Sequence, residues 1–169
     1  EAIEMVVFMN YTYSIQFNET NLPLSNTWCV NLSNGLRSGP IQNMNYTFLL
    51  VNGTYTYSVG TSDKYYKVNP GRFIVNGGNI SEKIRFSMAY STTFYESGLP
   101  SGTTWFVNLS DKESSGGVTG STTVIMLING TYNYTIGAEN KIYHANGSSF
   151  IVNGNNSKVQ IQFYKVEYA

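Results

Sequence analysis

The chain contains the same sequence pattern twice, with no gap between matching positions. The segment Thr27–Ser33 (TWCVNLS) returns as Thr104–Ser110 (TWFVNLS), and Phe73–Gly77 (FIVNG) returns unchanged as Phe150–Gly154. Both pairs give one offset, since 104 − 27 and 150 − 73 both equal 77. A tandem duplication of this length predicts two small domains of the same fold. We expect them at residues 12–88 and 89–169, preceded by an N-terminal arm at residues 1–11.

Within each copy, apolar and polar residues alternate with the two-residue period of a β-strand. Trp28 and Val30 fall on one face of such a strand and Asn31 falls on the other. No segment keeps a helical period. The sequence therefore predicts an all-β protein with two tandem immunoglobulin-like β-sandwich domains and an extended N-terminal strand. Asn-Gly dipeptides supply hairpin or turn signals, and they begin at Asn34, Asn52, Asn76, Asn129, Asn146 and Asn153.

The composition narrows the class of protein. Ten Lys and Arg balance ten Asp and Glu, and charged residues make up only 12% of the chain. A nucleic-acid binder needs a basic face, so we expect no nucleic acid as a partner. Cys29 is the only cysteine, which excludes an internal disulfide. No apolar run is long enough to span a membrane. The polar, uncharged, tyrosine-rich composition predicts a secreted protein, and because the chain opens with Glu1 we expect its signal peptide to have been removed.

The first ten residues are strongly apolar, with Ala2, Ile3, Met5, Val6, Val7, Phe8 and Met9 among them. As a strand, this arm places Ile3, Met5, Val7 and Met9 on one face and Val6 and Phe8 on the other. Burial of apolar surface is worth roughly 25 cal/mol per Å², so we expect the arm to be buried.

Three interpretations of the arm remain open. It folds back as an extra strand on its own domain, it is a remnant of a signal sequence or of processing, or it completes a sheet of a neighbouring molecule as a donor strand. In the third case the arm projects from the first domain into the second domain of the neighbour. Such a head-to-tail contact does not close on itself, so its product is a filament.

Asn-X-Ser/Thr sequons are more frequent than this composition predicts by chance. Asn-Gly-Thr turns produce some of them for backbone reasons alone, whereas Asn31, Asn108 and Asn133 lie within expected strands on the polar face. We therefore expect a heavily N-glycosylated surface with covalent N-linked glycans and no cofactor. The candidates are Asn10, Asn18, Asn31, Asn45, Asn52, Asn79, Asn108, Asn129, Asn133, Asn146 and Asn155.

Residues that carry catalysis form no recognisable set. His144 is the only histidine, and Lys67 stands at its position in the first copy. Glu19 and Glu96 recur shortly before a Leu-Pro turn but lie one repeat apart, so we expect each to cap its own turn. No paired acids, Ser/His/Asp arrangement, phosphate-binding loop or metal-ligand cluster appears. The sequence predicts neither an enzyme nor a metal site.

The string Glu96–Trp105 (ESGLPSGTTW), followed by Ile128–Tyr132 (INGTY) and Phe150–Gly154, resembles a β-sandwich repeat of archaeal secreted and cell-surface proteins. That repeat also accompanies thermopsin-like acid proteases as a noncatalytic module. The resemblance covers both copies, although the first has NLPLSN where the second has GLPSGT. A pair of such domains with an apolar arm also resembles the subunits of archaeal threads, which are thin glycosylated surface filaments joined by donor-strand complementation. Neither copy obviously lacks a strand, which leaves the acceptor of a donor strand undefined.

The resemblance implies a structural subunit of a pilus-like filament on the archaeal cell surface. The expected partner is the chain itself, in a head-to-tail homopolymer held by Ile3, Met5, Val6, Val7, Phe8 and Met9. Contacts with the cell surface or with glycans, as in adhesion, are further expectations. The competing hypothesis is a monomeric extracellular carbohydrate-binding or accessory domain of a secreted archaeal protein, which predicts saturable glycan binding through exposed aromatic side chains.

Overall fold

The computed structural model describes residues 11–166, and these form strands and turns with no helix. The prediction of an all-β protein is therefore confirmed. The chain divides into two compact units, Glu1–Ser87 (unit 1) and Met88–Ala169 (unit 2). The strands up to the end of unit 1 are β1 (Tyr13–Thr20), β2 (Trp28–Leu32), β3 (Asn45–Leu50), β4 (Gly53–Thr61), β5 (Tyr66–Lys67), β6 (Gly71–Val75), β7 (Ile80–Arg85) and β8 (Ser87–Met88). The remaining strands are β9 (Tyr90–Ser97), β10 (Trp105–Leu109), β11 (Thr122–Leu127), β12 (Gly130–Ala138), β13 (Tyr143–His144), β14 (Ser148–Val152), β15 (Ser157–Gln162) and β16 (Tyr164–Lys165).

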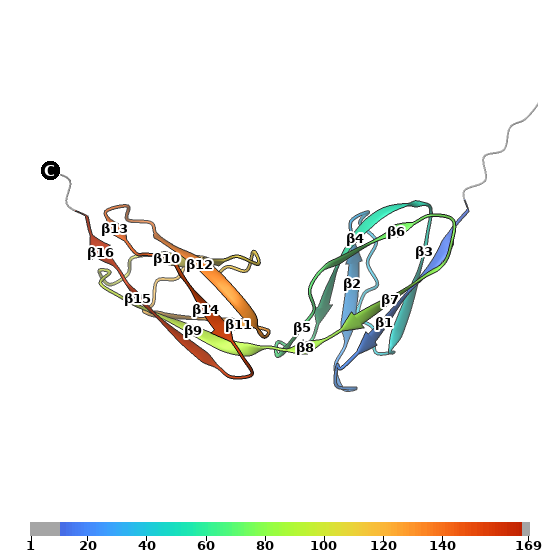
Figure 1. Ribbon diagram of the computed structural model, residues 1–169, viewed down its shortest axis with the longest axis horizontal. Coiled ribbons are helices and arrows are strands. Elements are labelled where there is room, and N and C mark those ends of the chain that lie inside the picture. Colours follow the sequence, from blue (N-terminus) through green and yellow to red (C-terminus); the bar gives the residue numbers. More distant parts are fainter. Residues whose placement is uncertain (1–10, 167–169) are drawn as a thin grey trace, which may run out of the picture. The chain divides into compact units, whose positions relative to one another are not determined.

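Two three-stranded sheets form unit 1, one with the order β3-β1-β7 and the other with the order β2-β4-β6 (Figure 1). β1 is antiparallel to β3 and parallel to β7, so the first and last long strands of the unit are neighbours. A short ribbon joins β5 to β8.

The core of unit 1 lies between these two sheets and follows the predicted alternation. Phe17 of β1 is fully buried, and its ring meets Phe48, Tyr57 and Phe73 edge-on at centroid distances of 5.9, 5.1 and 5.8 Å. Phe48 belongs to the sheet of β1, whereas Tyr57 and Phe73 belong to the other sheet. Aromatic side chains from both sheets therefore form one continuous core.

Unit 2 repeats this arrangement, with the sheets β11-β9-β15 and β10-β12-β14 and the ribbon β13-β16. β9 is antiparallel to β11 and parallel to β15. Each unit buries one tryptophan whose indole N–H is satisfied in the same way: Trp28 donates to the carbonyl of Asn43 at 2.8 Å, and Trp105 to that of Gly120 at 2.7 Å. The duplicated sequence is thus matched by duplicated hydrogen bonding inside the core.

The strand order differs from that of an immunoglobulin constant domain, in which strands A, B, E and D form one sheet and C, F and G the other. Here one sheet takes the first, third and seventh strands of the unit, and the other takes the second, fourth and sixth. The immunoglobulin likeness therefore extends to the two-sheet architecture and not to the connectivity.

The Asn-Gly dipeptides mark turns between sheets as well as local bends. Asn52-Gly53 links β3 to β4, with Gly53 as the first residue of β4, and Asn76-Gly77 lies between β6 and β7. Each pair of strands belongs to two different sheets. The side-chain oxygen of Asn52 accepts a hydrogen bond of 2.8 Å from the amide of Gly77, which ties these two turns together. Asn129 accepts the same bond from Gly154 at 2.7 Å in unit 2.

Candidate assembly edges and glycosylation sites

The residues predicted to form the donor strand, Ile3, Met5, Val6, Val7, Phe8 and Met9, lie outside the described residues. The described part of the chain shows instead which sheet edges are available for another strand. A sheet edge carries backbone N–H and C=O groups without a partner, and an added strand satisfies them. The edges of the two units are therefore the candidate assembly sites.

Two outer strands are already covered. The bridge between Trp28 and Ile41 covers the outer edge of β2 through hydrogen bonds of 2.7 and 3.0 Å. The bridge between Trp105 and Val118 covers β10 in the same way, with bonds of 2.8 and 2.9 Å. In the four three-stranded sheets, the remaining outer strands with a described neighbour on one side only are β3, β6, β7, β11, β14 and β15. The strands of the two short ribbons, β5 with β8 and β13 with β16, also have one neighbour each.

Several of these open edges carry exposed aliphatic side chains. Ile74 on β6 is 54% exposed and Ile151, at the same repeat position on β14, is 67% exposed. Leu49 on β3 and Val124 on β11 are also exposed. An unpaired edge with exposed aliphatic side chains is a template for another strand.

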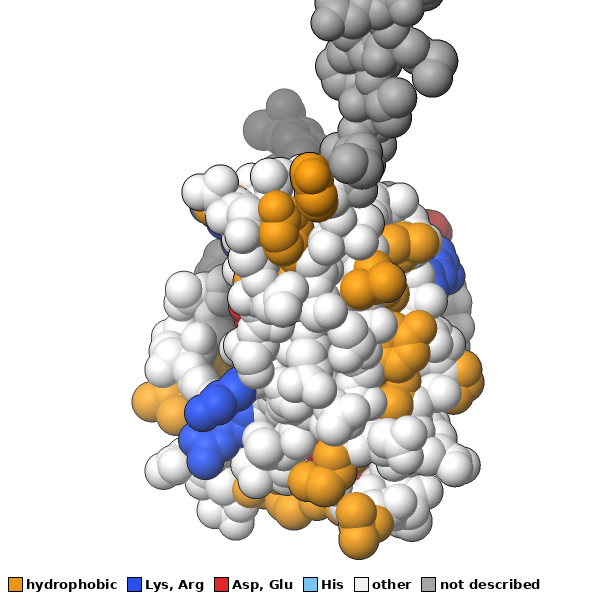
Figure 2. Space-filling view, turned by 90° about the vertical axis from the view of Figure 1, so that its right-hand side faces the viewer, with side chains coloured by type: hydrophobic (Ala, Val, Ile, Leu, Met, Phe, Trp, Pro, Cys, Tyr) orange, Lys and Arg blue, Asp and Glu red, His pale blue; other side chains and the backbone are white. Residues whose placement is uncertain are grey.

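The rest of the surface is poor in charge. Figure 2 shows one face on which white, uncharged polar groups dominate, hydrophobic side chains are scattered in small groups, and charged side chains occupy only a few places. With this little charge, long-range electrostatic attraction contributes little to the recognition of a partner.

The structure describes every predicted glycosylation site except Asn10, which lies outside the described residues. None of the described candidates is buried. Asn18 and Asn31 are half-buried, and the exposed ones are Asn45, Asn52, Asn79, Asn108, Asn129, Asn133, Asn146 and Asn155. Asn108 on β10 and Asn133 on β12 lie on neighbouring strands and alternate with the buried Val107 and Tyr132, as the sequence predicted.

The candidate asparagines differ in which side-chain atom, the oxygen or the nitrogen, takes part in a hydrogen bond. An N-glycan is attached to the side-chain nitrogen, Nδ2. In Asn52, Asn79 and Asn129 the recorded bonds engage only the oxygen, which accepts from Gly77, Ser14 and Gly154 respectively. In Asn18, Nδ2 itself donates to Ser81 Oγ at 3.0 Å and to the carbonyl of Gln16 at 3.4 Å. The sequence indicated that Asn-Gly-Thr asparagines serve the backbone of their own turns, but the hydrogen bonds from Gly77 to Asn52 and from Gly154 to Asn129 were not predicted. The recurrence of these asparagines in both copies was the available signal.

The recurring glutamates act locally. The carboxylate of Glu19 accepts a hydrogen bond of 3.4 Å from the amide of Leu22, and Glu96 accepts the same bond from Leu99. Each side chain therefore caps the turn that follows the first strand of its unit, as expected from the sequence.

The remaining reactive side chains are dispersed. His144 is exposed, and its ring stacks on Tyr164 at a centroid distance of 6.3 Å. Cys29 is half-buried beside Gly60. Within residues 11–166, no three His, Cys, Asp or Glu side chains come close enough together to hold a metal ion.

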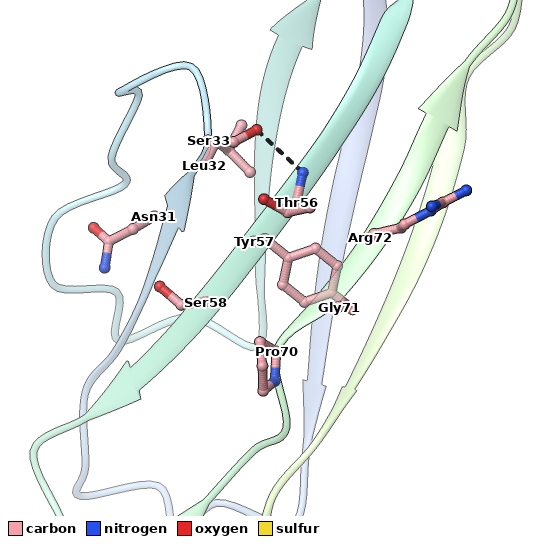
Figure 3. Close-up of a pocket in the computed structure, with 9 residues that line it drawn as sticks. All are labelled: Asn31, Leu32, Ser33, Thr56, Tyr57, Ser58, Pro70, Gly71 and Arg72. Carbon is pink, nitrogen blue, oxygen red and sulfur yellow. Dashed lines mark hydrogen bonds between the residues drawn. The ribbon is translucent and has the colours of Figure 1, made fainter. Parts of the chain in front are cut away.

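A hollow on unit 1 lies over β2, β4 and the start of β6 (Figure 3). Its only charged lining residue is Arg72, and the hydroxyl of Ser33 accepts a hydrogen bond of 3.1 Å from the amide of Thr56. Tyr57 lies beneath Gly71, where a Cβ would overlap the phenol ring. Because Tyr57 is only 9% exposed, its ring face is not available to stack on a sugar.

The phenol of Tyr57 donates a hydrogen bond of 3.3 Å to Glu82 Oε2. Burial raises the pKa of Tyr57, and the charge of Glu82 and this hydrogen bond raise it further. Burial likewise raises the pKa of Tyr132, with added effects of the Asp111 and Glu113 charges. The Tyr57–Glu82 pair was not predicted from the sequence, although Glu82 interrupts the apolar positions Ile80 and Ile84 of β7.

No helix in the part of the chain that the structure describes has the length and apolar character needed to cross a membrane.

Neither a protein-family model nor the sequence of a curated protein matches the chain. Solved structures do match. GBS52, the minor pilin of the Gram-positive pathogen Streptococcus agalactiae, has 10% identity and a TM-score of 0.45, with 93% of this chain and 98% of that chain covered. A streptococcal ancillary pilin has 13% identity and a TM-score of 0.40, with 90% and 62% covered. The Bacillus anthracis TIE protein has 16% identity and a TM-score of 0.36; the match covers 92% of this chain, which spans only 35% of that protein.

Proposed function

We propose that this chain is the structural subunit of an extracellular filament. Residues 1–10 of one copy add as a donor strand to a sheet edge of the next copy, and repetition of this contact gives a head-to-tail homopolymer. The surface of the polymer carries N-linked glycans, and the archaeal cell surface is its location.

The observation that carries the proposal is the presence, in one chain, of a ten-residue apolar segment and of sheet edges that no strand within residues 11–166 covers. An apolar strand loses its contact with water when it pairs, and an open edge gains backbone hydrogen bonds. A contact between two different surfaces of one molecule leaves both surfaces free at the ends of the assembly, so growth continues. The resemblance of the repeats to archaeal thread subunits agrees with this mode of assembly.

The exposure of the sequons supports the glycan part of the proposal. Eight of the ten candidates among residues 11–166 are exposed, and two of these, Asn108 and Asn133, project from strands where no turn requires an asparagine. The hollow of Figure 3 does not favour the binding-module alternative, because its aromatic ring, Tyr57, is buried, and the exposed tyrosines Tyr11, Tyr65 and Tyr164 do not line it.

Deletion of residues 1–10 tests the proposal. Within residues 11–166, Tyr13 and later residues already form two hydrophobic cores, so the shortened chain is expected to keep its circular dichroism spectrum and unfolding transitions. It should no longer polymerise, as judged by electron microscopy and light scattering. Filaments formed by the shortened chain at the rate of the full chain would refute the proposal.

A point substitution distinguishes loss of the strand from loss of chain length. Val7→Asp places a charge within the apolar arm and is expected to block polymerisation, because burial of an unpaired carboxylate is costly. Glu4→Gln changes a charged position of the same arm and serves as the matched control that still polymerises. Equal polymerisation of both variants would count against a buried arm.

A further inference from the structure

The two copies differ sharply along one pair of edges. In unit 1, the open strands β6 and β7 carry four charged side chains, Arg72, Glu82, Lys83 and Arg85. At the matching positions of β14 and β15, unit 2 has Ser149, Val159, Gln160 and Gln162. Unit 2 gains one charge in return, Lys158 in place of Ser81. Charged side chains on an edge strand protect it against pairing with another strand. The β6 and β7 edges of unit 1 are therefore better protected than the β14 and β15 edges of unit 2.

The core side chains next to β14 in unit 2 are also more exposed than those next to β6 in unit 1. Phe73 of β6 and Tyr57 of β4 are buried at 6% and 9% exposure. Their counterparts, Phe150 of β14 and Tyr134 of β12, are only half-buried, although both rings pack on Phe94 at centroid distances of 5.7 and 5.9 Å. Apolar side chains from a further strand would complete the cover over these two rings.

The open edges β3 and β11 fit less well. Both are uncharged, but their inward-facing side chains are already covered: Phe48 and Leu50 are buried on β3, and Ile125 and Leu127 on β11. A strand added beside β3 or β11 would contact exposed aliphatic side chains only on the outer face of the sheet.

We propose that the donor strand of a second copy, residues 1–10, pairs with the open edge of β14 in unit 2. The inference rests on the proposed function and names the acceptor for it. β14 offers apolar contacts on both faces, with Phe150 turned toward the core and Ile151 exposed on the outer face. The arm is apolar on both faces as well, with Ile3, Met5, Val7 and Met9 on one and Val6 and Phe8 on the other. Ten extended residues span about 33 Å, which exceeds the roughly 17 Å of five-residue β14.

The duplication supplies a matched pair of variants for the test. Ile151→Lys places a charge at the acceptor edge, and Ile74→Lys makes the same change at the same repeat position of unit 1. Because both side chains are exposed, both variants are expected to fold, which thermal unfolding checks. Ile151→Lys should lose polymerisation and Ile74→Lys should retain it. Ser149→Arg, which installs the residue that β6 has at this position, is a second variant expected to block assembly.

Mixing two blocked chains makes the test stronger. Ile151→Lys keeps a donor strand and lacks an acceptor, whereas the chain without residues 1–10 keeps an acceptor and lacks a donor. Together they should form a one-to-one heterodimer and nothing longer, measured by light scattering coupled to size-exclusion chromatography. The combination of Ile151→Lys and the deletion in one chain should stay monomeric when mixed with either.

Hydrogen–deuterium exchange gives a readout without substitutions. In filaments, amides of residues 148–152 should gain protection relative to the chain without residues 1–10, and amides of residues 71–75 should not. Protection at 71–75 instead, or polymerisation by Ile151→Lys and Ser149→Arg, would overturn the assignment of β14 while leaving the donor strand intact. Polymerisation by the chain without residues 1–10 would overturn the proposed function itself.

Discussion

At the level of single residues, an asparagine whose side-chain nitrogen, Nδ2, already donates hydrogen bonds is a poorer site for a glycan than one whose Nδ2 does not. Asn18 uses Nδ2 to bridge Ser81 Oγ on β7 and the carbonyl of Gln16 on its own strand. Asn133 is exposed on β12, and the hydrogen bonds recorded there involve its backbone and Ser110. A glycan on Asn18 would disturb one hydrogen bond from β1 to β7 and one within β1, whereas a glycan on Asn133 would project from an exposed sheet face.

We therefore predict that Asn133 is occupied and Asn18 is not. Mass spectrometry of glycopeptides from the protein of its native source measures both sites in one sample. Asn133→Gln should remove one glycan mass, and Asn18→Gln should leave the glycan mass unchanged. A fully occupied Asn18 would show that the glycan is added before β1 and β7 pair.

Tyr57 links a single side chain to the pH dependence of stability. Its pKa in the folded unit is raised above the ordinary value of 10.0 by burial and by Glu82. A group with a raised folded pKa contributes its stability below the unfolded pKa, and this contribution is lost as the pH rises through the folded pKa. Unit 1 should therefore lose stability as the pH is raised above 10.

Tyr57→Phe should reduce this alkaline loss of stability while lowering stability at neutral pH by about 1 kcal/mol for the lost hydrogen bond. Urea unfolding at neutral and alkaline pH measures both effects, and the exposed Tyr164→Phe is the control. An alkaline loss in Tyr57→Phe equal to that of the original chain would mean that other groups cause it.

At the scale of elements, the turn after the first strand of each unit requires a left-handed backbone. Copy one meets this need with Asn21 at φ 72° and copy two with Gly98 at φ 95°. A Cβ at Gly98 would also overlap the backbone carbonyl of Phe163, the residue that follows β15. In unit 2 the backbone beside this turn therefore leaves no room for a side chain, whereas unit 1 accommodates Asn21 with the same parallel pairing of its first and last long strands.

Gly98→Ala should destabilise unit 2 more than Gly154→Ala. Both residues have positive φ, and each alanine costs about 1–2 kcal/mol on that account. At Gly154 a Cβ meets nothing within 4 Å, whereas the overlap at Gly98 adds about 1–3 kcal/mol. Urea unfolding followed by tryptophan fluorescence measures the difference, since Trp105 reports on unit 2. Equal losses would show that Phe163 moves aside without cost.

At the scale of the whole molecule, the duplication produces two units with different edges. Unit 1 carries charges along β6 and β7, and unit 2 has mostly uncharged residues at the matching positions. If the donor strand belongs to the start of the chain and the acceptor to unit 2, the subunit has two unlike ends. In the proposed filament, a contact between these two unlike surfaces would give growth a direction.

Assembly through apolar strands should depend little on salt. The chain has zero net charge and β14 is uncharged, so electrostatic steering contributes little to the encounter of two copies. The rate of polymerisation followed by light scattering should change by less than about twofold between low and high sodium chloride. A steep decrease with salt would point to charged contacts, with Lys158→Gln as the variant to examine.

The local features of this protein can be predicted from its sequence. A two-residue alternation shows which side chains share a face, so it identified the strands and the buried Trp28 and Trp105. The constant offset identified the duplication, and the Asn-Gly dipeptides located turns. These features are readable because they depend on residues next to each other in the chain.

Which strands are neighbours could not be predicted from the sequence and is known from the folded structure. Any two strands can form backbone hydrogen bonds, so no local pattern shows that β1 pairs in parallel with β7, that Asn52-Gly53 connects two sheets, or that segments 36–41 and 113–118 cover β2 and β10. The edges left open follow from that pairing. The contrast between Arg72 and Ser149, visible in the sequence as a difference between copies, gained its meaning once both residues were found on open edge strands.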